Sequence, residues 1–177
     1  MEQAVRKIAL LGMGTVGGGV YEIIEKQKEE MPFKIGAALE VVKVLVRNKA
    51  KYADRIPAEK LTDVWEDVIG DDSIDIVVEV MGGIEPARTY IKAALEKGKH
   101  VVTANKDLMA MHGHELLELA GEHHCDLLFE AAVAGGIPII RPLKQCLAGN
   151  NITEIMGIIN GTTNFILTKM KEEGMDF

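Results

Sequence analysis

The feature that most constrains the fold is a glycine-rich turn near the N-terminus. An apolar run over residues 8–11 leads into Gly12-Met13-Gly14-Thr15-Val16-Gly17, a Gly-x-Gly-x-x-Gly pattern, and an amphipathic segment follows. In a βαβ unit that binds a dinucleotide, the first glycine allows the tight turn out of the strand, the second lets the backbone approach a pyrophosphate, and the third lets the helix pack close to the strand. The sequence therefore predicts an NAD(P) site here; the alternative is a strand–helix turn without a ligand. The residues expected to contact the cofactor are Leu11, Gly12, Gly14, Thr15, Val16 and Gly17.

Strand-length apolar runs alternate with helix-length segments in the following part of the chain. Predicted strands cover residues 6–11, 39–46, 74–80, 100–103 and 127–131, and predicted helices cover residues 16–30, 64–70, 87–97 and 108–123. The first of these helices is expected to end before Pro32. Near-continuous apolar strands separated by helices are typical of a parallel sheet that is covered on both faces. We therefore expect an α/β fold of the Rossmann type, with a doubly wound parallel sheet, over residues 1–130.

The character of the sequence changes at residue 131. A turn of small residues over 131–138 is followed by a predicted helix at 139–147, a strand at 151–159 and a helix at 161–171. One strand and two helices are too little for an independent domain. We therefore interpret residues 131–177 as the start of a second, α+β domain.

Composition excludes several classes of protein. The 177 residues carry a formal net charge of −7, from 20 basic and 27 acidic residues, and no basic block that would favour a nucleic-acid partner. The apolar stretch near the N-terminus breaks at Gly12, which makes it too short for a signal-peptide core or a membrane span. Cys125 and Cys146 lack the spacing of a metal or redox motif. We expect reduced thiols, no membrane partner and a cytoplasmic location.

Six segments resemble the homoserine dehydrogenase family, and the match runs over essentially all 177 positions. They are Gly12-Met13-Gly14-Thr15-Val16-Gly17, Val44-Leu45-Val46-Arg47, Val78-Glu79-Val80-Met81-Gly82-Gly83-Ile84-Glu85-Pro86-Ala87, Thr103-Ala104-Asn105-Lys106, Glu130-Ala131-Ala132-Val133-Ala134-Gly135-Gly136-Ile137-Pro138 and Asn160-Gly161-Thr162-Thr163-Asn164. The resemblance implies an oxidoreductase that reduces aspartate 4-semialdehyde to L-homoserine with NADH or NADPH. It also implies a role in the biosynthesis of threonine, methionine and isoleucine.

Members of this family continue well past residue 177, through the rest of a substrate and dimerisation domain. The resemblance therefore implies a homodimer for the full-length enzyme. We expect this chain to bind the cofactor but to lack part of the active site. Two other interpretations remain open at this point: a non-catalytic NAD(P)-binding module, and another dehydrogenase that acts on a small aldehyde or amino acid.

Two predicted strand ends carry residues suited to the two halves of the cofactor. Arg47 closes the second predicted strand, where a guanidinium suits a 2′-phosphate and therefore favours NADP or tolerance of both cofactors. Lys60 could add charge there, although a surface role is the simpler interpretation. Gly82 and Gly83 follow the third strand and would let the backbone approach the nicotinamide half. The alternatives are a solvated arginine and a plain turn before the helix that starts at Pro86.

Lys106 is the residue expected to carry the chemistry. It follows the fourth predicted strand in Thr103-Ala104-Asn105-Lys106, at the same edge of the sheet. A cation there could polarise an aldehyde oxygen and stabilise developing alkoxide charge, or relay a proton. The resemblance implies that Lys106 lies between nicotinamide and substrate, with Thr103 beside the cofactor. The alternative is a solvated loop lysine.

Two further sets of residues rest on the resemblance. It implies a sodium-type site at Glu130, Val133, Gly135 and Ile137, built from backbone carbonyls and one carboxylate, which are the oxygen ligands that hard cations prefer. The alternative is an acid that caps the turn. The resemblance also implies that Gly161 and Thr162 contact the substrate, whereas Thr162 could instead be an ordinary helix N-cap.

Overall fold

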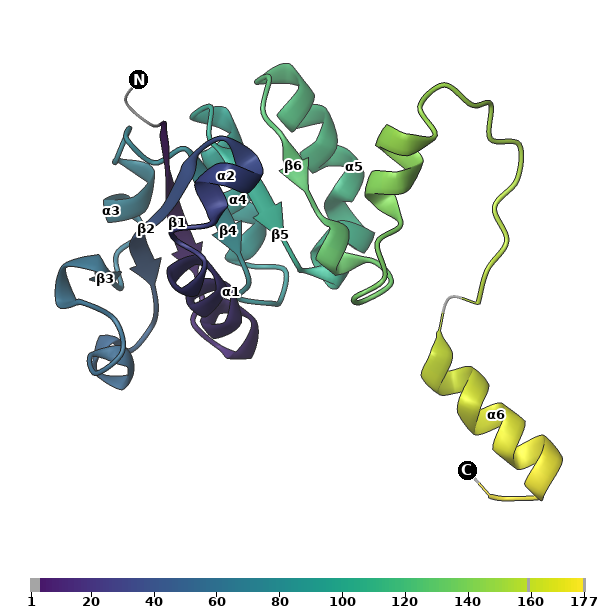
Figure 1. Cartoon of the computed structure of the whole chain (residues 1–177). Coiled ribbons are helices and arrows are strands. Elements are labelled where there is room, and N and C mark those ends of the chain that lie inside the picture. Colours follow the sequence, from purple (N-terminus) through teal and green to yellow (C-terminus); the bar gives the residue numbers. More distant parts are fainter. Residues whose placement is uncertain (1–3, 159, 177) are drawn as a thin grey trace. The chain divides into compact units, whose positions relative to one another are not determined.

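The predicted apolar runs form a parallel sheet in the computed structural model of the chain, which describes residues 4–158 and 160–176. Contacts within the chain define two units, Met1–Gly135 and Gly136–Phe177. The sheet lies in the first unit, and its strand order among the described residues is β3-β2-β1-β4-β5-β6 (Figure 1). The strands are β1 (Val5–Leu11), β2 (Ala38–Leu45), β3 (Leu61–Thr62), β4 (Ile76–Glu79), β5 (His100–Thr103) and β6 (Leu127–Leu128).

The strand order reverses direction between β1 and β4. From β1 the chain proceeds through β2 to β3 on one side, and from β4 through β5 to β6 on the other, with every neighbouring pair parallel. This is the doubly wound topology predicted from the sequence. In such sheets the ligand site lies at the reversal point, outside the carboxyl ends of the strands.

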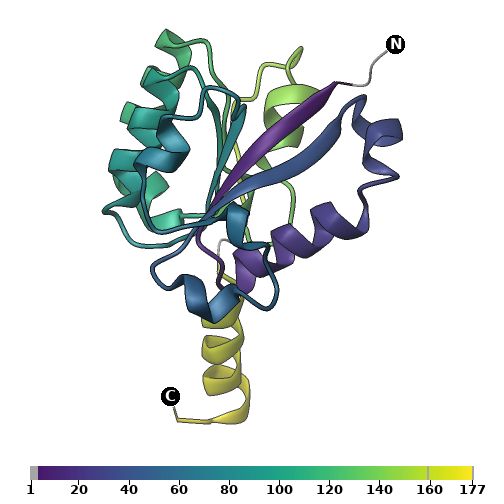
Figure 2. The same ribbon diagram turned by 90° about the vertical axis from the view of Figure 1, so that its left-hand side faces the viewer.

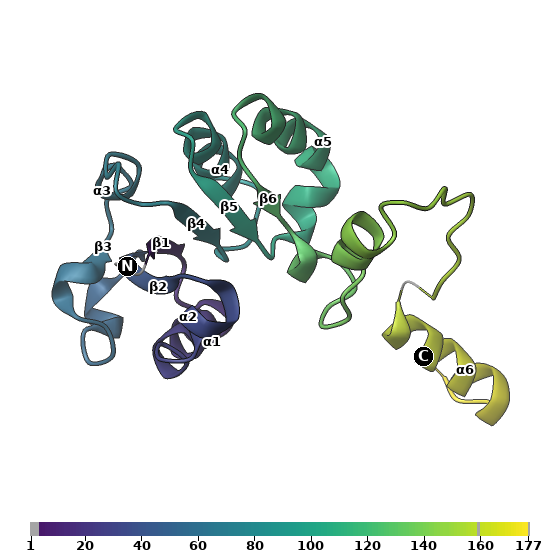
Figure 3. The ribbon, with the colours of Figure 1, turned by 45° about the horizontal axis from the view of Figure 1, so that its top comes forward.

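Helices cover both faces of the sheet, as Figures 2 and 3 show. One face buries α3 (Glu66–Ile69), α4 (Ala87–Glu96) and α5 (Lys106–Glu122) through a cluster that includes Val68, Ile91, Leu95 and Leu116. The other face packs against α1 (Thr15–Lys26), whose Ile24 joins a second cluster. Alternate residues of β1 point to opposite faces, because side chains along a strand alternate. Both faces of the sheet are therefore apolar core.

Two predicted elements in the first unit end several residues earlier than expected, and one short strand was not predicted. The helix expected over 16–30 ends at Lys26, and Pro32 lies in the first turn of a separate short helix, α2 (Met31–Ile35), where a missing N–H costs nothing. The strand expected over 127–131 stops at Leu128, because the chain turns into a 3₁₀ helix, η3 (Glu130–Ala132). Strand β3 was not predicted, since two residues are too few to produce a pattern.

The second unit contains η4 (Pro142–Cys146), which is a turn of π-helix, and α6 (Gly161–Glu173). The strand expected over 151–159 is wrong for residues 151–158, which have no strand hydrogen bonding; Ile159 lies outside the described residues. A strand exists only beside a pairing partner, and the described residues of this unit contain no other strand. The apolar side chains of Ile155 and Met156 are exposed.

Among the described residues, no helix combines the length and apolar character needed to cross a membrane.

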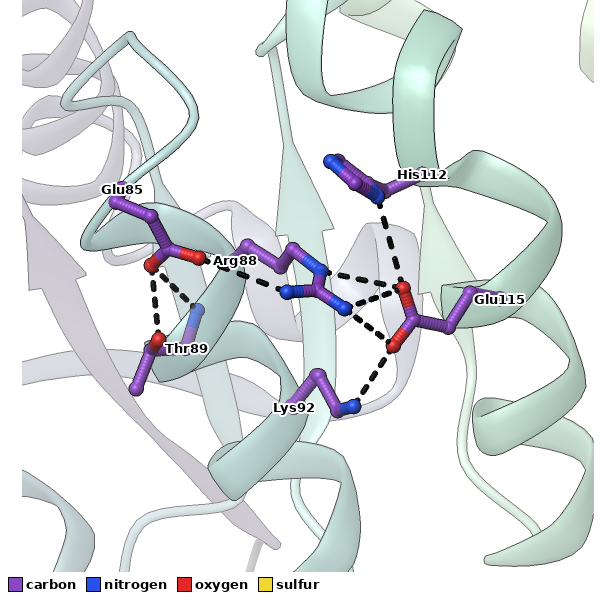
Figure 4. Close-up of polar contacts among 6 residues, drawn as sticks. All are labelled: Glu85, Arg88, Thr89, Lys92, His112 and Glu115. Atoms are coloured by element: carbon purple, nitrogen blue, oxygen red, sulfur yellow. Dashed lines mark hydrogen bonds and ion pairs between the residues drawn. The ribbon is translucent and has the colours of Figure 1, made fainter.

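An ion-pair cluster joins α4 to α5 (Figure 4). Glu115 on α5 accepts from Arg88 through Nη2 (2.8 Å) and Nε (3.1 Å), and from Lys92 Nζ (2.7 Å). His112 Nδ1 lies 3.6 Å from the same carboxylate. Hydrogen bonds from Lys92 and then Arg88 lower the pKa of Glu115 from its ordinary 4.5 to about 2. A carboxylate held by a forked guanidinium fixes the two helices relative to each other.

The lowered pKa of Glu115 should make the free energy of unfolding depend on pH under acidic conditions. The folded pKa lies below the unfolded one, so the stabilising contribution is complete above about pH 4.5 and is lost as the pH falls toward about 2. We expect Glu115→Gln to lower the free energy of unfolding at neutral pH and to flatten its pH dependence in that window. Urea unfolding at several pH values measures both, with Glu118→Gln as the control. Equal acid sensitivity in the two variants would contradict the assignment.

Candidate dinucleotide-binding cleft

The glycine turn between β1 and α1 has two close backbone approaches, one to the end of β2 and one between Gly17 and Gly12. Gly12 has φ +99° and donates its N–H to the carbonyl oxygen of Leu45 (3.0 Å). A Cβ on Gly17 would lie 2.2 Å from the carbonyl oxygen of Gly12, closer than any side chain could sit. A Cβ on Gly14 would meet no atom within 4 Å. Gly12 and Gly17 are therefore required by the fold, whereas a side chain at Gly14 would enter open space.

A cleft of about 560 Å³ opens at the reversal point of the sheet, beside the ends of β1, β2 and β4. Four residues predicted to bind the cofactor line it, which are Gly12, Gly14, Arg47 and Gly82. Lining residues that the sequence did not single out include Met13, Asn48, Lys51, Tyr52, Asp63, Pro86 and Tyr90. Leu11 is buried below the turn, and Thr15 and Val16 are exposed at the start of α1.

One wall of the cleft carries positive charge. Arg47 lies two residues after the end of β2, and Lys51 comes from the short 3₁₀ helix η1 (Lys49–Tyr52), with its ammonium 5.4 Å from the ring centre of Tyr52. Lys49 forms an ion pair with Asp63 at 2.7 Å. Lys60 is not among the described residues that line the cleft. Because Arg47 and Lys51 both face the cleft, an anionic group could bind between them.

The cleft lining also includes an aromatic side chain that stacks on a second ring. Tyr90, on α4, lines the cleft and stacks on Trp65 with ring centres 4.1 Å apart and planes 11° from parallel. Pro86 precedes the same helix and also lines the cleft. A flat apolar surface of this kind suits the face of a heterocyclic ring.

A buried hydrogen-bond network holds the ends of β4 and β5 together. Glu79 is fully buried and accepts from Thr103 Oγ1 (2.6 Å), Met81 N–H (2.8 Å) and Gly82 N–H (3.3 Å). Thr103 is also fully buried, and its hydroxyl accepts from the Asn105 N–H (3.0 Å). The network therefore fixes the turn that lines the cleft. The Thr103 hydroxyl is engaged by Glu79 and the Asn105 N–H within this network.

Asn105 extends this network to Gly83 and to α5. Its amide donates to the Gly83 carbonyl (2.6 Å), and its side-chain oxygen caps the helix by accepting from the Leu108 N–H (3.1 Å). Lys106, the first residue of α5, is exposed and lines a separate hollow of about 460 Å³ with Phe129 and Val133. The predicted lysine is thus held next to the Gly82–Gly83 turn through the cap, but it lies outside the main cleft.

The remaining predicted residues lie in two different units. Glu130, Val133 and Gly135 belong to the first unit, where Gly135 has φ +60°, and the exposed Ile137 belongs to the second. The described residues contain no group of three or more His, Cys, Asp or Glu that could hold a metal ion.

Gly161 and Thr162 form the first turn of α6, within the second unit. The helix N-cap there is Asn160, whose side chain accepts from the Thr163 N–H (2.8 Å). The alternative in which Thr162 is the N-cap is therefore wrong.

Comparisons with known proteins agree on one family. Residues 12–130 match the family model described as homoserine dehydrogenase, NAD binding domain, and residues 138–177 match the one described as homoserine dehydrogenase. Homoserine dehydrogenase from Bacillus subtilis (strain 168) is 51% identical over 168 residues, which are 94% of this chain and 39% of the relative. The homologue from Synechocystis sp. is 51% identical over 172 residues, 97% of this chain and 39% of the relative.

Solved structures give the same result. A homoserine dehydrogenase from Thiobacillus denitrificans matches with a TM-score of 0.86 and 45% identity, covering 98% of this chain and 41% of that one. A hyperthermophilic archaeal homoserine dehydrogenase in complex with NADPH matches with a TM-score of 0.77 and 30% identity, covering 97% and 58%. The chain spans 39% of the length of the two curated relatives.

The Glu79 network predicts an unusual sensitivity at Thr103. Thr103→Val keeps the shape but leaves a carboxylate oxygen and the Asn105 N–H without a partner, so we expect a loss of roughly 2–4 kcal/mol in the free energy of unfolding. Urea denaturation measures this loss. Thr89→Val, which removes an exposed hydroxyl that donates to Glu85, is the control and should cost under about 1 kcal/mol. Similar losses in both variants would show that the buried network contributes little.

Proposed function

The chain belongs to the homoserine dehydrogenase family, and from this premise we propose that its cleft binds NAD(P)H for the reduction of aspartate 4-semialdehyde to L-homoserine. The observation that carries the proposal is the geometry at Gly14, where the backbone borders the cleft and a side chain would enter open space. In dinucleotide-binding folds this is the glycine over which the pyrophosphate lies.

The N-terminus of α1 supports pyrophosphate binding. The helix starts at Thr15, and its first helical hydrogen bond runs from the Gly18 N–H to the Gly14 carbonyl (2.8 Å). The backbone N–H groups of Thr15, Val16 and Gly17 precede that bond and belong to the positive end of the helix dipole. An anionic group at the cleft would accept from these N–H groups.

The charged wall supports a preference for NADPH. Arg47 follows β2, the strand that ends beside the adenosine ribose in this fold. Its guanidinium, with Lys51 in the same cleft, suits the 2′-phosphate that distinguishes NADPH from NADH. The archaeal relative solved with NADPH is consistent with this preference.

At the other half of the cofactor site, we assign Gly82, Gly83 and Thr103 to the nicotinamide side and Lys106 to catalysis. The bound cofactor supplies the hydride. The Lys106 ammonium is proposed to donate to the aldehyde oxygen and to stabilise the negative charge that develops there. The Asn105 cap and the Glu79 network orient the start of α5, and so hold Lys106 in position.

We propose the domain division 1–130 for cofactor binding and 131–177 for substrate binding and dimerisation. Gly161 and Thr162 are the proposed substrate contacts. A sodium-type site at Glu130, Val133, Gly135 and Ile137 stays a prediction from the family resemblance. The family further implies a cytoplasmic homodimer in threonine, methionine and isoleucine biosynthesis.

Substitutions at two glycines of the turn should have different effects, one on cofactor binding and the other on stability. Gly14 has φ −75°, which alanine adopts freely, so Gly14→Ala should fold normally but bind NADPH at least about tenfold more weakly. Gly17→Ala should lose roughly 3 kcal/mol or more of stability, because its methyl group meets the Gly12 carbonyl. Gly19→Ala, with open space around it, is the control and should be about 0.5–1 kcal/mol more stable. Thermal unfolding and calorimetric titration measure the two effects. Unchanged NADPH binding by Gly14→Ala would contradict the assignment.

The test of the proposed function is calorimetric titration of the chain with NADPH and with NADH, for the wild type and Arg47→Ala. Loss of a charged hydrogen-bonded pair should weaken NADPH binding by about 10- to 100-fold and leave NADH nearly unchanged. Arg6→Ala removes the same charge at the opposite ends of the strands and should alter neither. If wild-type chain binds neither cofactor, the proposal is wrong.

A further inference from the structure

We propose that Asp63, through a charge that its ion pair with Lys49 partly offsets, weakens 2′-phosphate binding in the cleft and thereby sets the preference between NADPH and NADH. The inference rests on the proposed function, since it names a specificity residue for the same site. Asp63 was not singled out by its sequence context, and the fold brings it to the cleft.

The topology places Asp63 beside Arg47. Strands β2 and β3 are parallel neighbours, and the N–H of Val46, the residue after β2, donates to the carbonyl of Thr62, the last residue of β3 (2.9 Å). Arg47 and Asp63 are the next residues of the two segments, so they leave the same edge of the sheet. Both line the cleft, together with Lys51.

Asp63 forms an ion pair with one of three cationic residues that are close together in the sequence. Residues 47–51 contain Arg47, Lys49 and Lys51. Lys49 Nζ lies 2.7 Å from Asp63 Oδ1, and both side chains are about half exposed. The hydrogen bond from Lys49 lowers the pKa of Asp63, so this carboxylate is charged at neutral pH. The pair leaves Arg47 and Lys51 to meet an anion, while a negative charge remains in the same cleft.

The two cofactors should respond differently to this charge. A phosphate monoester carries about −1.5 to −2 charges at neutral pH, whereas the ribose hydroxyl of NADH carries none. A carboxylate in the cleft repels the phosphate, and its ion pair with Lys49, which is not among the described residues that line the cleft, partly offsets that negative charge. The pyrophosphate is common to both cofactors and should respond equally in each, so only the 2′-phosphate gives NADPH an added response to changes at Asp63 or Lys49.

Titrations of the 177-residue chain with NADPH and NADH test the inference. Asp63→Asn should tighten NADPH binding about three- to tenfold, the size of one exposed charge interaction, and leave NADH within about twofold. Lys49→Gln should weaken NADPH binding by a similar factor, because Asp63 is then unpaired. The Asp63→Asn gain should shrink in 1 M salt, where the screening length falls to about 3 Å.

Matched variants separate charge from structure. Asp63→Glu keeps the charge and should bind both cofactors like the wild type, and Asp54→Asn removes an exposed charge that does not line the cleft. Thermal unfolding confirms that each variant folds. If NADPH and NADH affinities of Asp63→Asn shift together, or neither shifts while the wild type binds both, the inference is wrong and the proposed function stands. If the wild type binds neither cofactor, both are overturned.

Discussion

The close approach of α1 to the turn that leaves β1 is the contact on which both the fold and the proposed site depend. At Gly17 the helix backbone comes so near the Gly12 carbonyl that a Cβ would lie 2.2 Å from it. This approach sets the helix N-terminus against the edge of the sheet, where the strand order reverses. The positive end of the helix dipole therefore borders the cleft. Thr15, the first residue of the helix, is exposed, whereas Gly17, two residues later, is buried against the turn.

A buried carboxylate performs the equivalent task on the other side of the reversal point. Removing a charge from water is costly unless it is well hydrogen-bonded, and Glu79 accepts from one hydroxyl and two backbone N–H groups. Those donors come from β5 and from the turn after β4, so a single side chain ties two strand ends together. Asn105 continues the connection to Gly83 and to the first turn of α5. The Gly82–Gly83 turn has no side chains, and hydrogen bonds of its backbone with Glu79 and Asn105 hold it in place.

How much could be predicted from the sequence depends on the range over which each signal acts. Long apolar strands and amphipathic helices carry their own pattern, so the sheet topology could be derived from it. Residues 151–158 carry a strand-like pattern, but pairing needs a neighbour that the described part of the second unit does not contain. Gly14 and Arg47 belong to local motifs, and both line the cleft as expected. Asp63 and Tyr90 reach the cleft only through the tertiary fold, so no local pattern marks them.

The stacking of Trp65 on Tyr90 has a practical consequence. Trp65 is the one tryptophan of the chain, and its stacking partner forms part of the cleft wall. Indole emission is sensitive to the position of a ring in contact with it and to a nearby chromophore that absorbs it. Trp65 therefore serves as an intrinsic fluorescence reporter that contacts a residue of the cleft wall. It needs no label, and its signal comes from a single position in the chain.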